Sequence, residues 1–160
     1  MNNALTVNNL KKVYDGKKGV KGISFKVREG EILGLLGPNG AGKSTTINIL
    51  ATILKADSGE VNILGKDLRK DAKAIKYGIG VVPQDLAIYG EISAEENVRF
   101  FASLYKLRGK QLEDNVKEAL ELVALYDRKD DKPKTFSGGM KRRLNIACAI
   151  AHKPKLIIMD

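Results

Sequence analysis

The segment GPNGAGKST, Gly37–Thr45, constrains the architecture of this 160-residue chain more strongly than any other part of the sequence. It matches the pattern G-x-x-x-x-G-K-[ST] through Gly37, Gly42, Lys43 and Ser44. Glycines allow the backbone to curl so that successive N–H groups point inward, and a helix start adds unpaired N–H groups and the positive end of its dipole. The segment therefore predicts a phosphate-binding loop, formed by Gly37, Pro38, Asn39, Gly40, Ala41, Gly42, Lys43, Ser44 and Thr45.

Two side chains of this loop are candidates for chemistry on a nucleotide. Lys43 supplies a positive point charge for the β- and γ-phosphates, and the Ser44 hydroxyl is a hard oxygen ligand for Mg²⁺. A carboxylate on a neighbouring strand usually completes such a magnesium site, and Asp160, at the end of the run LIIMD, is the candidate. The alternative for Asp160 is a surface residue that follows an ordinary core strand.

The segments on both sides of the loop predict strands and one helix. Alternating apolar residues predict strands at residues 4–9 and 22–27, and the apolar run EILGLLG, residues 31–37, predicts a strand buried on both faces. Residues 44–54 show helical spacing through Ile47, Leu50, Ile53 and Leu54. Further short strands are predicted at residues 60–64, 78–84 and 156–159, the last of them buried.

A mainly helical part is predicted between the strand-rich parts. Ser93 and Glu96 stand at capping-box spacing, which predicts a helix start. A second helix is indicated by an apolar stripe, and a third opens directly after Gly138 and Gly139. The sequence thus predicts an α/β core at residues 1–84 and 136–160, with a helical subdomain at residues 85–135. The apolar stripe consists of Leu112, Val116, Leu120 and Val123.

Composition places the chain among soluble globular proteins, with 43% hydrophobic and 29% charged residues. Neither a signal-peptide run nor a stretch of about 20 apolar residues is present, so a cytoplasmic location is expected. The net charge of +9 suits a polyanionic partner, which can be nucleic acid, anionic lipid or the phosphates of a nucleotide. Cys148 is expected to be a buried, unreactive thiol, and His152 a solvated residue at a helix end.

Four motifs in a common order resemble the ATP-binding cassette (ABC) family across essentially the whole chain. They are the loop, FSGGM at residues 136–140, VVPQ ending at Gln84, and LIIMD, and Tyr14 matches the family's adenine-stacking aromatic. The resemblance implies a P-loop NTPase core, with a mixed sheet that includes N-terminal antiparallel strands, plus an inserted helical subdomain. It implies ATP and Mg²⁺ as cofactors, Lys43 and Gln84 as catalytic residues, and Ser44, Gln84 and Asp160 as magnesium ligands. A Tyr packed in an ordinary strand is the alternative for Tyr14.

The resemblance also implies partners. In the family two cassettes pair head to tail, so Ser137, Gly138 and Gly139 would cap the γ-phosphate held by a second nucleotide-binding subunit. A transmembrane subunit would hold the protein at the cytoplasmic face of the membrane. Met140 and Phe136 replace the usual Gln and Leu, but SGGMKRRL resembles the branch of bacterial drug and antibiotic exporters, which favours export. Three environments stay open for Arg142 and Arg143: phosphate, the surroundings of the helical subdomain, or solvent on an exposed helix face.

The family's catalytic glutamate follows the aspartate of LIIMD directly, and a switch histidine comes later. The printed sequence ends at Asp160, so we expect a C-terminally truncated domain that binds Mg-ATP but hydrolyses it little or not at all. Two alternatives stay open: a non-catalytic ATP-binding fragment, and a soluble cassette ATPase acting on nucleic acid or the ribosome. The positive charge favours the latter, but neither a long coiled coil nor a second cassette is evident, so a nucleic-acid partner is not expected.

Overall fold

The computed structural model describes residues 2–14 and 17–160, and of residues 17 and 18 it describes the backbone alone. The chain forms two compact units, Met1–Ile79 together with Asp160, and Gly80–Met159. The predicted helical subdomain, residues 85–135, falls within the second unit, and its boundaries stay a prediction. Each unit has its own buried hydrophobic residues.

The first unit contains an antiparallel sheet whose strand order is β2-β1-β3-β4. Thr6 of β1 lies opposite Lys26 of β2 on one side and Asn62 of β3 on the other. The register shifts near Asn9, whose φ is 46°, and this bulge keeps Leu10 on the same buried face as Val7. The strands are β1 (Asn3–Tyr14), β2 (Lys17–Arg28), β3 (Ser58–Ile63) and β4 (Lys66–Asp67).

Helix α1 (Lys43–Leu50) begins directly after Gly42, so its first turn includes the last residues of the predicted loop. It buries Ile47, Ile49 and Leu50 in the first unit. The prediction that the helix continues to Leu54 is wrong, because Thr52 adopts a left-handed φ of 63° that ends it. Ile53 is consequently 72% exposed. A shorter helix, α2 (Ala72–Gly78), follows β4 in the same unit.

The predicted buried strand at residues 31–37 is wrong. These residues form no helix or strand, and Ile32 and Leu36 are 98% and 95% exposed. A strand buried on both faces needs a hydrogen-bonded neighbour on each edge and covering side chains on each face. No strand in the described part of the chain is paired with this segment, so Ile32, Leu33 and Leu36 are exposed.

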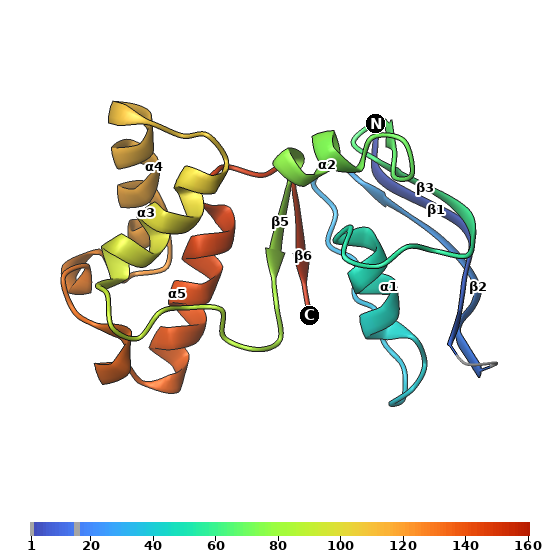
Figure 1. Ribbon diagram of the computed structural model, residues 1–160, viewed down its shortest axis with the longest axis horizontal. Helices are drawn as coiled ribbons and strands as arrows, with labels where there is room; N and C mark the ends of the chain where they lie inside the picture. Colours follow the sequence, from blue (N-terminus) through green and yellow to red (C-terminus); the bar gives the residue numbers. More distant parts are fainter. Residues whose placement is uncertain (1, 15–16) are drawn as a thin grey trace. The chain divides into compact units, whose positions relative to one another are not determined.

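The second unit is built around three helices, α3, α4 and α5, which pack side by side (Figure 1). The predicted stripe of α4 is confirmed, since Val116, Leu120 and Val123 are buried in the core that the three helices share. This core also contains Val98 of α3 and Leu144 of α5. The elements are α3 (Ala94–Leu104), α4 (Gly109–Leu122), α5 (Gly138–Ile150) and the short 3₁₀ helices η1 (Tyr126–Arg128) and η2 (Pro133–Thr135).

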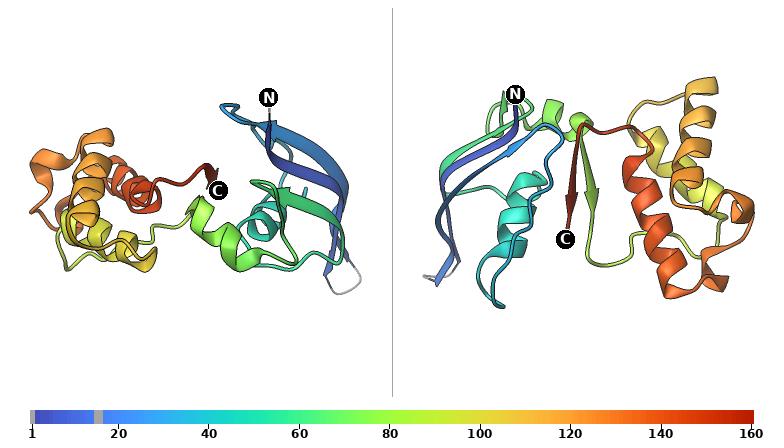
Figure 2. Two further views of the ribbon diagram at one scale, coloured as in Figure 1. Left: turned by 90° about the horizontal axis from the view of Figure 1, so that it is seen from above. Right: turned by 180° about the vertical axis from the view of Figure 1, so that it is seen from behind.

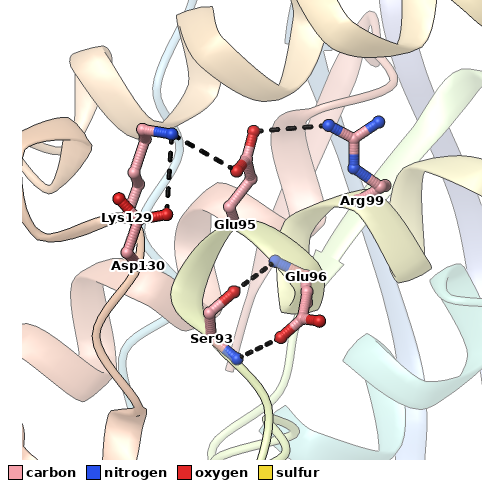
Figure 3. Close-up of polar contacts among 6 residues, drawn as sticks. All are labelled: Ser93, Glu95, Glu96, Arg99, Lys129 and Asp130. Atoms are coloured by element: carbon pink, nitrogen blue, oxygen red, sulfur yellow. Dashed lines mark hydrogen bonds and ion pairs between the residues drawn. The ribbon is translucent and has the colours of Figure 1, made fainter.

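A capping box starts α3, as predicted. The Ser93 hydroxyl accepts from the Glu96 N–H at 3.1 Å, and the Glu96 carboxylate accepts from the Ser93 N–H at 2.7 Å (Figure 3). The bond from the Ser93 N–H to the carboxylate, followed by the interaction of the carboxylate with the Ser93 side chain, holds the pKa of Glu96 below its ordinary value. The neighbouring Glu95 pairs with Arg99 and Lys129, so acidic side chains gather where the helix dipole favours negative charge.

Two short strands, β5 (Ile79–Val82) and β6 (Leu156–Met159), form a second sheet and run in the same direction (Figures 1 and 2). Ile158 of β6 is buried, whereas Ile157 and Met159 are exposed, so the prediction of a fully buried strand is wrong. Among the described residues this sheet has two strands, so one edge of each strand is unpaired. The fold class predicted from the sequence is confirmed, namely α/β with antiparallel N-terminal strands and several helices. None of the described helices has the length and apolar character needed to cross a membrane.

Candidate functional site

The loop before α1 has the backbone conformation that its glycines allow. Gly40 and Gly42 have φ values of 81° and 89°, in the left-handed region that side chains disfavour. The N–H of Ala41 donates to the carbonyl of Pro38 at 3.2 Å, which closes a tight turn. Gly42 then caps α1, so the loop and the first turn of the helix together present backbone N–H groups suited to phosphate oxygens.

Lys43 lies over this loop. Its ammonium group donates to the carbonyl oxygens of Gly37 at 2.6 Å and Pro38 at 2.9 Å. The positive charge is therefore held beside the N–H groups of the turn, where it meets any phosphate that binds there. The opposite side of the helix start is fixed by Thr46, whose buried hydroxyl donates to the carbonyl of Gly42 at 2.9 Å. Sequence reasoning did not single out Thr46.

Ser44 and Asp160 are brought together although they lie 116 positions apart in the sequence. The Ser44 hydroxyl donates to Oδ1 of Asp160 at 3.4 Å, and both residues belong to the first unit. A hydroxyl and a carboxylate are the hard oxygen ligands that Mg²⁺ takes in nucleotide sites. Among the described residues, no cluster of three or more His, Cys, Asp or Glu side chains is present that would hold a metal by itself. The donor set thus suits a metal ion that takes its other ligands from phosphates and water.

Gly19 of β2 approaches both the Tyr14 ring and Gly42 of the phosphate-binding loop. A Cβ atom at Gly19 would lie 2.7 Å from Cε2 of Tyr14, so the aromatic ring rests against this glycine. The carbonyl of Gly19 in turn lies against Gly42, because a Cβ there would meet this oxygen at 2.1 Å. The Tyr14 side chain is 42% exposed, which leaves part of the ring open to a planar ligand. Gly19 lies where the register of β2 shifts, and a glycine inside a strand was the signal that sequence reasoning overlooked.

The other predicted site residues belong to the second unit. Gln84 is exposed and follows the end of β5. Ser137 caps α5, and its hydroxyl accepts from the Met140 N–H at 3.2 Å. Gly138 and Gly139 are exposed, and added Cβ atoms would meet nothing within 4 Å. The open helix start predicted at this turn is therefore present, while its role stays a prediction.

Arg142 and Arg143 both donate to backbone carbonyls of the second unit, in agreement with the predicted alternative that they face the surroundings of the helical subdomain, and Arg143 is also exposed. Arg143 donates to the carbonyls of Val123 and Ala124, at 2.9 and 3.2 Å, which closes the C-terminal end of α4. Arg142 donates to backbone carbonyls as well, in the segment that follows β5. Carbonyls at helix ends and in loops lack regular partners, and a guanidinium group satisfies two of them at once.

Cys148 and His152 lie outside the candidate site. The predicted burial of Cys148 is confirmed, and burial raises the pKa of its thiol to about 12, so the thiolate does not form at neutral pH. The prediction of a solvated His152 is wrong. Its ring stacks on Tyr105 with centroids 3.5 Å apart and planes 6° apart, because the turn after α5 brings it to the end of α3.

Comparison with known proteins identifies the family. The family model of the ABC transporters matches residues 20–160. The linearmycin resistance ATP-binding protein LnrL of Bacillus subtilis is 47% identical over 156 residues, and the daunorubicin resistance ATP-binding protein DrrA3 of Streptomyces coeruleorubidus is 34% identical over 157 residues. Each alignment covers 98% of this chain and 50% of the relative, so the chain spans about half the length of these relatives.

Solved structures agree with the sequence comparison. The structure of cbiO1 from Clostridium perfringens, part of the ABC transporter complex cbiONQ, has a TM-score of 0.90 and 32% sequence identity. This likeness covers 100% of the present chain and 66% of the cbiO1 chain. Together with the family match over most of the sequence, these findings show that the chain belongs to the ABC transporter family, among its ATP-binding subunits.

Proposed function

We propose that this chain binds Mg-ATP at the start of α1. The observation that carries the proposal is the pairing of Ser44 with Asp160 at 3.4 Å, at the same helix start that carries Lys43 and is capped by Gly42. In this proposal residues 37–45 hold the phosphates, and Ser44, Asp160 and Gln84 hold Mg²⁺ directly or through water. The partly exposed ring of Tyr14 stacks on adenine.

Mg²⁺ would supply a positive centre that neutralises charge on the β- and γ-phosphates. Lys43 would bind the same phosphates from the side of the loop, and the backbone N–H groups would orient them. Gln84 has both a carbonyl and an amide group, so its side chain can ligate the metal and orient a water molecule. We propose Lys43 and Gln84 as the catalytic residues of this chain for ATP hydrolysis by the full-length protein.

Asp160→Asn and Ser44→Ala test the metal site. Each substitution is expected to raise the Mg²⁺ concentration that gives half-maximal ATP binding by about 10- to 100-fold, the usual cost of disturbing a metal's ligand shell. ATP binding in EDTA should be unchanged or tighter in Asp160→Asn, because a negative charge beside the phosphates is removed. A fluorescent ATP analogue titrated with Mg²⁺ measures both quantities.

Glu60→Gln is the matched control, since it removes an equal charge from an exposed position on β3. Its Mg²⁺ titration should coincide with that of the parent protein. Equal Mg²⁺ responses in Asp160→Asn, Ser44→Ala and the parent would contradict the proposed metal site.

The full-length protein is proposed to act in export, as a head-to-tail dimer that hydrolyses ATP. The resistance proteins LnrL and DrrA3 are relatives over 98% of this chain, which supports an exported antibiotic-like substrate. The exposed turn Ser137–Gly139 supports the dimer, because a capped helix start with little steric cover suits an anion that comes from another subunit. In this arrangement the second nucleotide-binding subunit holds that anion, the γ-phosphate of its own ATP.

A membrane-embedded partner subunit is proposed to contact an exposed aromatic cluster of the second unit. Tyr89 and Phe100 are exposed and meet edge to face, with ring centroids 5.4 Å apart. The buried Asn97 fixes Tyr89 through two bonds, accepting from its N–H at 2.7 Å and donating to its carbonyl at 2.9 Å. Exposed aromatic side chains on a rigid backbone are typical anchors of protein interfaces.

The double substitution Tyr89→Ala with Phe100→Ala is expected to lower the membrane-bound fraction of the protein in its native cell by about tenfold, since such anchors carry much of an interface's free energy. Cell fractionation with immunodetection measures this fraction, and ATP binding should be retained. Leu122→Ser, which alters another exposed apolar residue of the second unit, is the control. An unchanged membrane-bound fraction in the double variant would exclude this surface as the contact.

A further inference from the structure

Two side chains of α5 hold the segment that carries Gln84. Nη1 of Arg142 donates to the carbonyl of Pro83 at 2.9 Å and to the carbonyl of Gln84 at 2.8 Å. Oδ1 of Asn145 accepts from the N–H of Ala87 at 3.1 Å, and its Nδ2 donates to the carbonyl of Pro83 at 3.4 Å. We call Arg142 and Asn145 together the α5 clamp. They lie three positions apart, on one face of the helix.

The held segment, residues 83–87, lies outside regular secondary structure. It follows the last residue of β5 and forms neither helix nor strand, so its backbone groups lack the partners that regular structure supplies. The planar guanidinium group of Arg142 presents donors in a fixed geometry that matches two successive carbonyls. The amide of Asn145 is buried and acts as donor and acceptor at once. The backbone at Gln84 is thus tied to α5, while the Gln84 side chain is exposed.

The same helix begins at the turn Ser137–Gly139. Arg142 comes one turn after Gly138, the first residue of α5, and an α-helix is stiff over this length. Arg143, the neighbouring residue, has a different task, since it closes the end of α4. One arginine of α5 therefore anchors the helix within the helical core, and the other connects it to the segment of Gln84.

We propose that Arg142 and Asn145 are positioning residues that make Gln84 and the turn Ser137–Gly139 move as one body. Contact of this turn with the nucleotide of a partner subunit then shifts the backbone of Gln84, and with it the Gln84 contact to Mg²⁺ on its own chain. This inference rests on the proposed function, in which Gln84 and the turn serve two different nucleotides. It adds the physical link between them, which is the set of hydrogen bonds from Arg142 and Asn145 to residues 83–87.

Hydrogen–deuterium exchange of the purified full-length protein tests the link without any nucleotide. Arg142→Met and Asn145→Leu are each expected to speed amide exchange in residues 84–87 by about fivefold or more, because they remove the bonds that order this segment. Arg143→Met removes a comparable pair of bonds and is the matched control. It should speed exchange near residues 123–126 and leave residues 84–87 unchanged.

Magnesium titrations test whether the clamp acts through Gln84. Arg142→Met is expected to raise the half-saturating Mg²⁺ concentration for a fluorescent ATP analogue about fivefold, and to have less than about a twofold effect when Gln84 is already alanine. Arg142→Lys keeps the positive charge and a donor group. It should therefore raise the half-saturating Mg²⁺ concentration less than Arg142→Met does. A merely structural role for Arg142 would give the same loss in both backgrounds.

The outcomes separate this inference from the proposed function. Failure of the parent protein to bind Mg-ATP would overturn both. The inference alone would be overturned by three results together. These are normal Mg-ATP binding by the parent, a raised half-saturating Mg²⁺ concentration in Gln84→Ala, and the parent's value in Arg142→Met. Unchanged exchange in residues 84–87 in both clamp variants would also overturn it. Fast exchange together with an effect of Arg142→Met that depends on Gln84 would support it.

Discussion

Replacing Lys43 with methionine is expected to lower the affinity for Mg-ATP by about 100-fold or more, since two charge-assisted hydrogen bonds to phosphate are lost. Methionine keeps the length and much of the apolar stem of lysine but has no charge and no donor. Equilibrium titration with a fluorescent ATP analogue, or calorimetry with ATP, measures the change.

The same substitution also removes the two bonds from Lys43 to the carbonyls of Gly37 and Pro38. These bonds are exposed, so their loss is expected to lower the free energy of unfolding by only about 1 kcal/mol. Binding should therefore fall much more than stability, and urea denaturation provides the second measurement. Lys26→Met, on the exposed face of β2, removes the same charge at a distance from the loop and should bind Mg-ATP normally. Equal affinities in Lys43→Met and Lys26→Met would exclude Lys43 as a phosphate ligand.

Gly42→Ala is expected to abolish Mg-ATP binding and to lower the free energy of unfolding by about 2–4 kcal/mol, through left-handed strain and a clash acting together. The φ of Gly42 is 89°, and a Cβ at this position would lie 2.1 Å from the carbonyl oxygen of Gly19. The loop and the strand have to separate to accept the methyl group. Separation would move the backbone N–H groups that the phosphates need.

Gly40→Ala is a control within the same loop. Gly40 has a similar φ of 81°, but an added Cβ would meet nothing within 4 Å. It should therefore lose only about 1–2 kcal/mol from backbone strain and retain measurable Mg-ATP binding. Urea denaturation and nucleotide titration of the two variants distinguish the effect of backbone strain, which both share, from the effect of the clash with Gly19, which only Gly42→Ala has. Equal losses of stability and of Mg-ATP affinity in both variants would show that the clash with the Gly19 carbonyl does not contribute to the effect.

Features specified by neighbouring residues could be predicted from the sequence. The capping box of Ser93 and Glu96, the apolar stripe of α4 and the helix start at Gly138 all depend on short spacings, and the structure has each of them. The loop belongs to the same class, because its glycines are needed by the local backbone. Family motifs supplied the remaining candidates, and of these the structure brings Ser44 and Asp160 together.

Features that depend on distant partners could not be predicted. The run at residues 31–37 has the composition of a buried strand, but burial requires neighbours that its own residues do not specify. The sequence around Arg142 and Asn145 is that of an ordinary helix, and only the structure shows that both side chains bind the backbone of the segment after β5. Gly19 is similar, because its small size matters only where Tyr14 and Gly42 approach it. Each of these cases turns on a contact between residues far apart in the chain.

The contact between Gly19 and Gly42 has a genetic consequence. The atom that obstructs a side chain at Gly42 is the main-chain oxygen of Gly19, which every amino acid carries. No substitution at position 19 can remove this main-chain oxygen. A smaller residue at the neighbouring position, which is the usual compensation for a larger side chain, is therefore not available here. Suppressors of a Gly42 substitution should therefore arise in residues that set the path of β2, or not at all. Selection on this loop thus extends to the residues that set the path of β2.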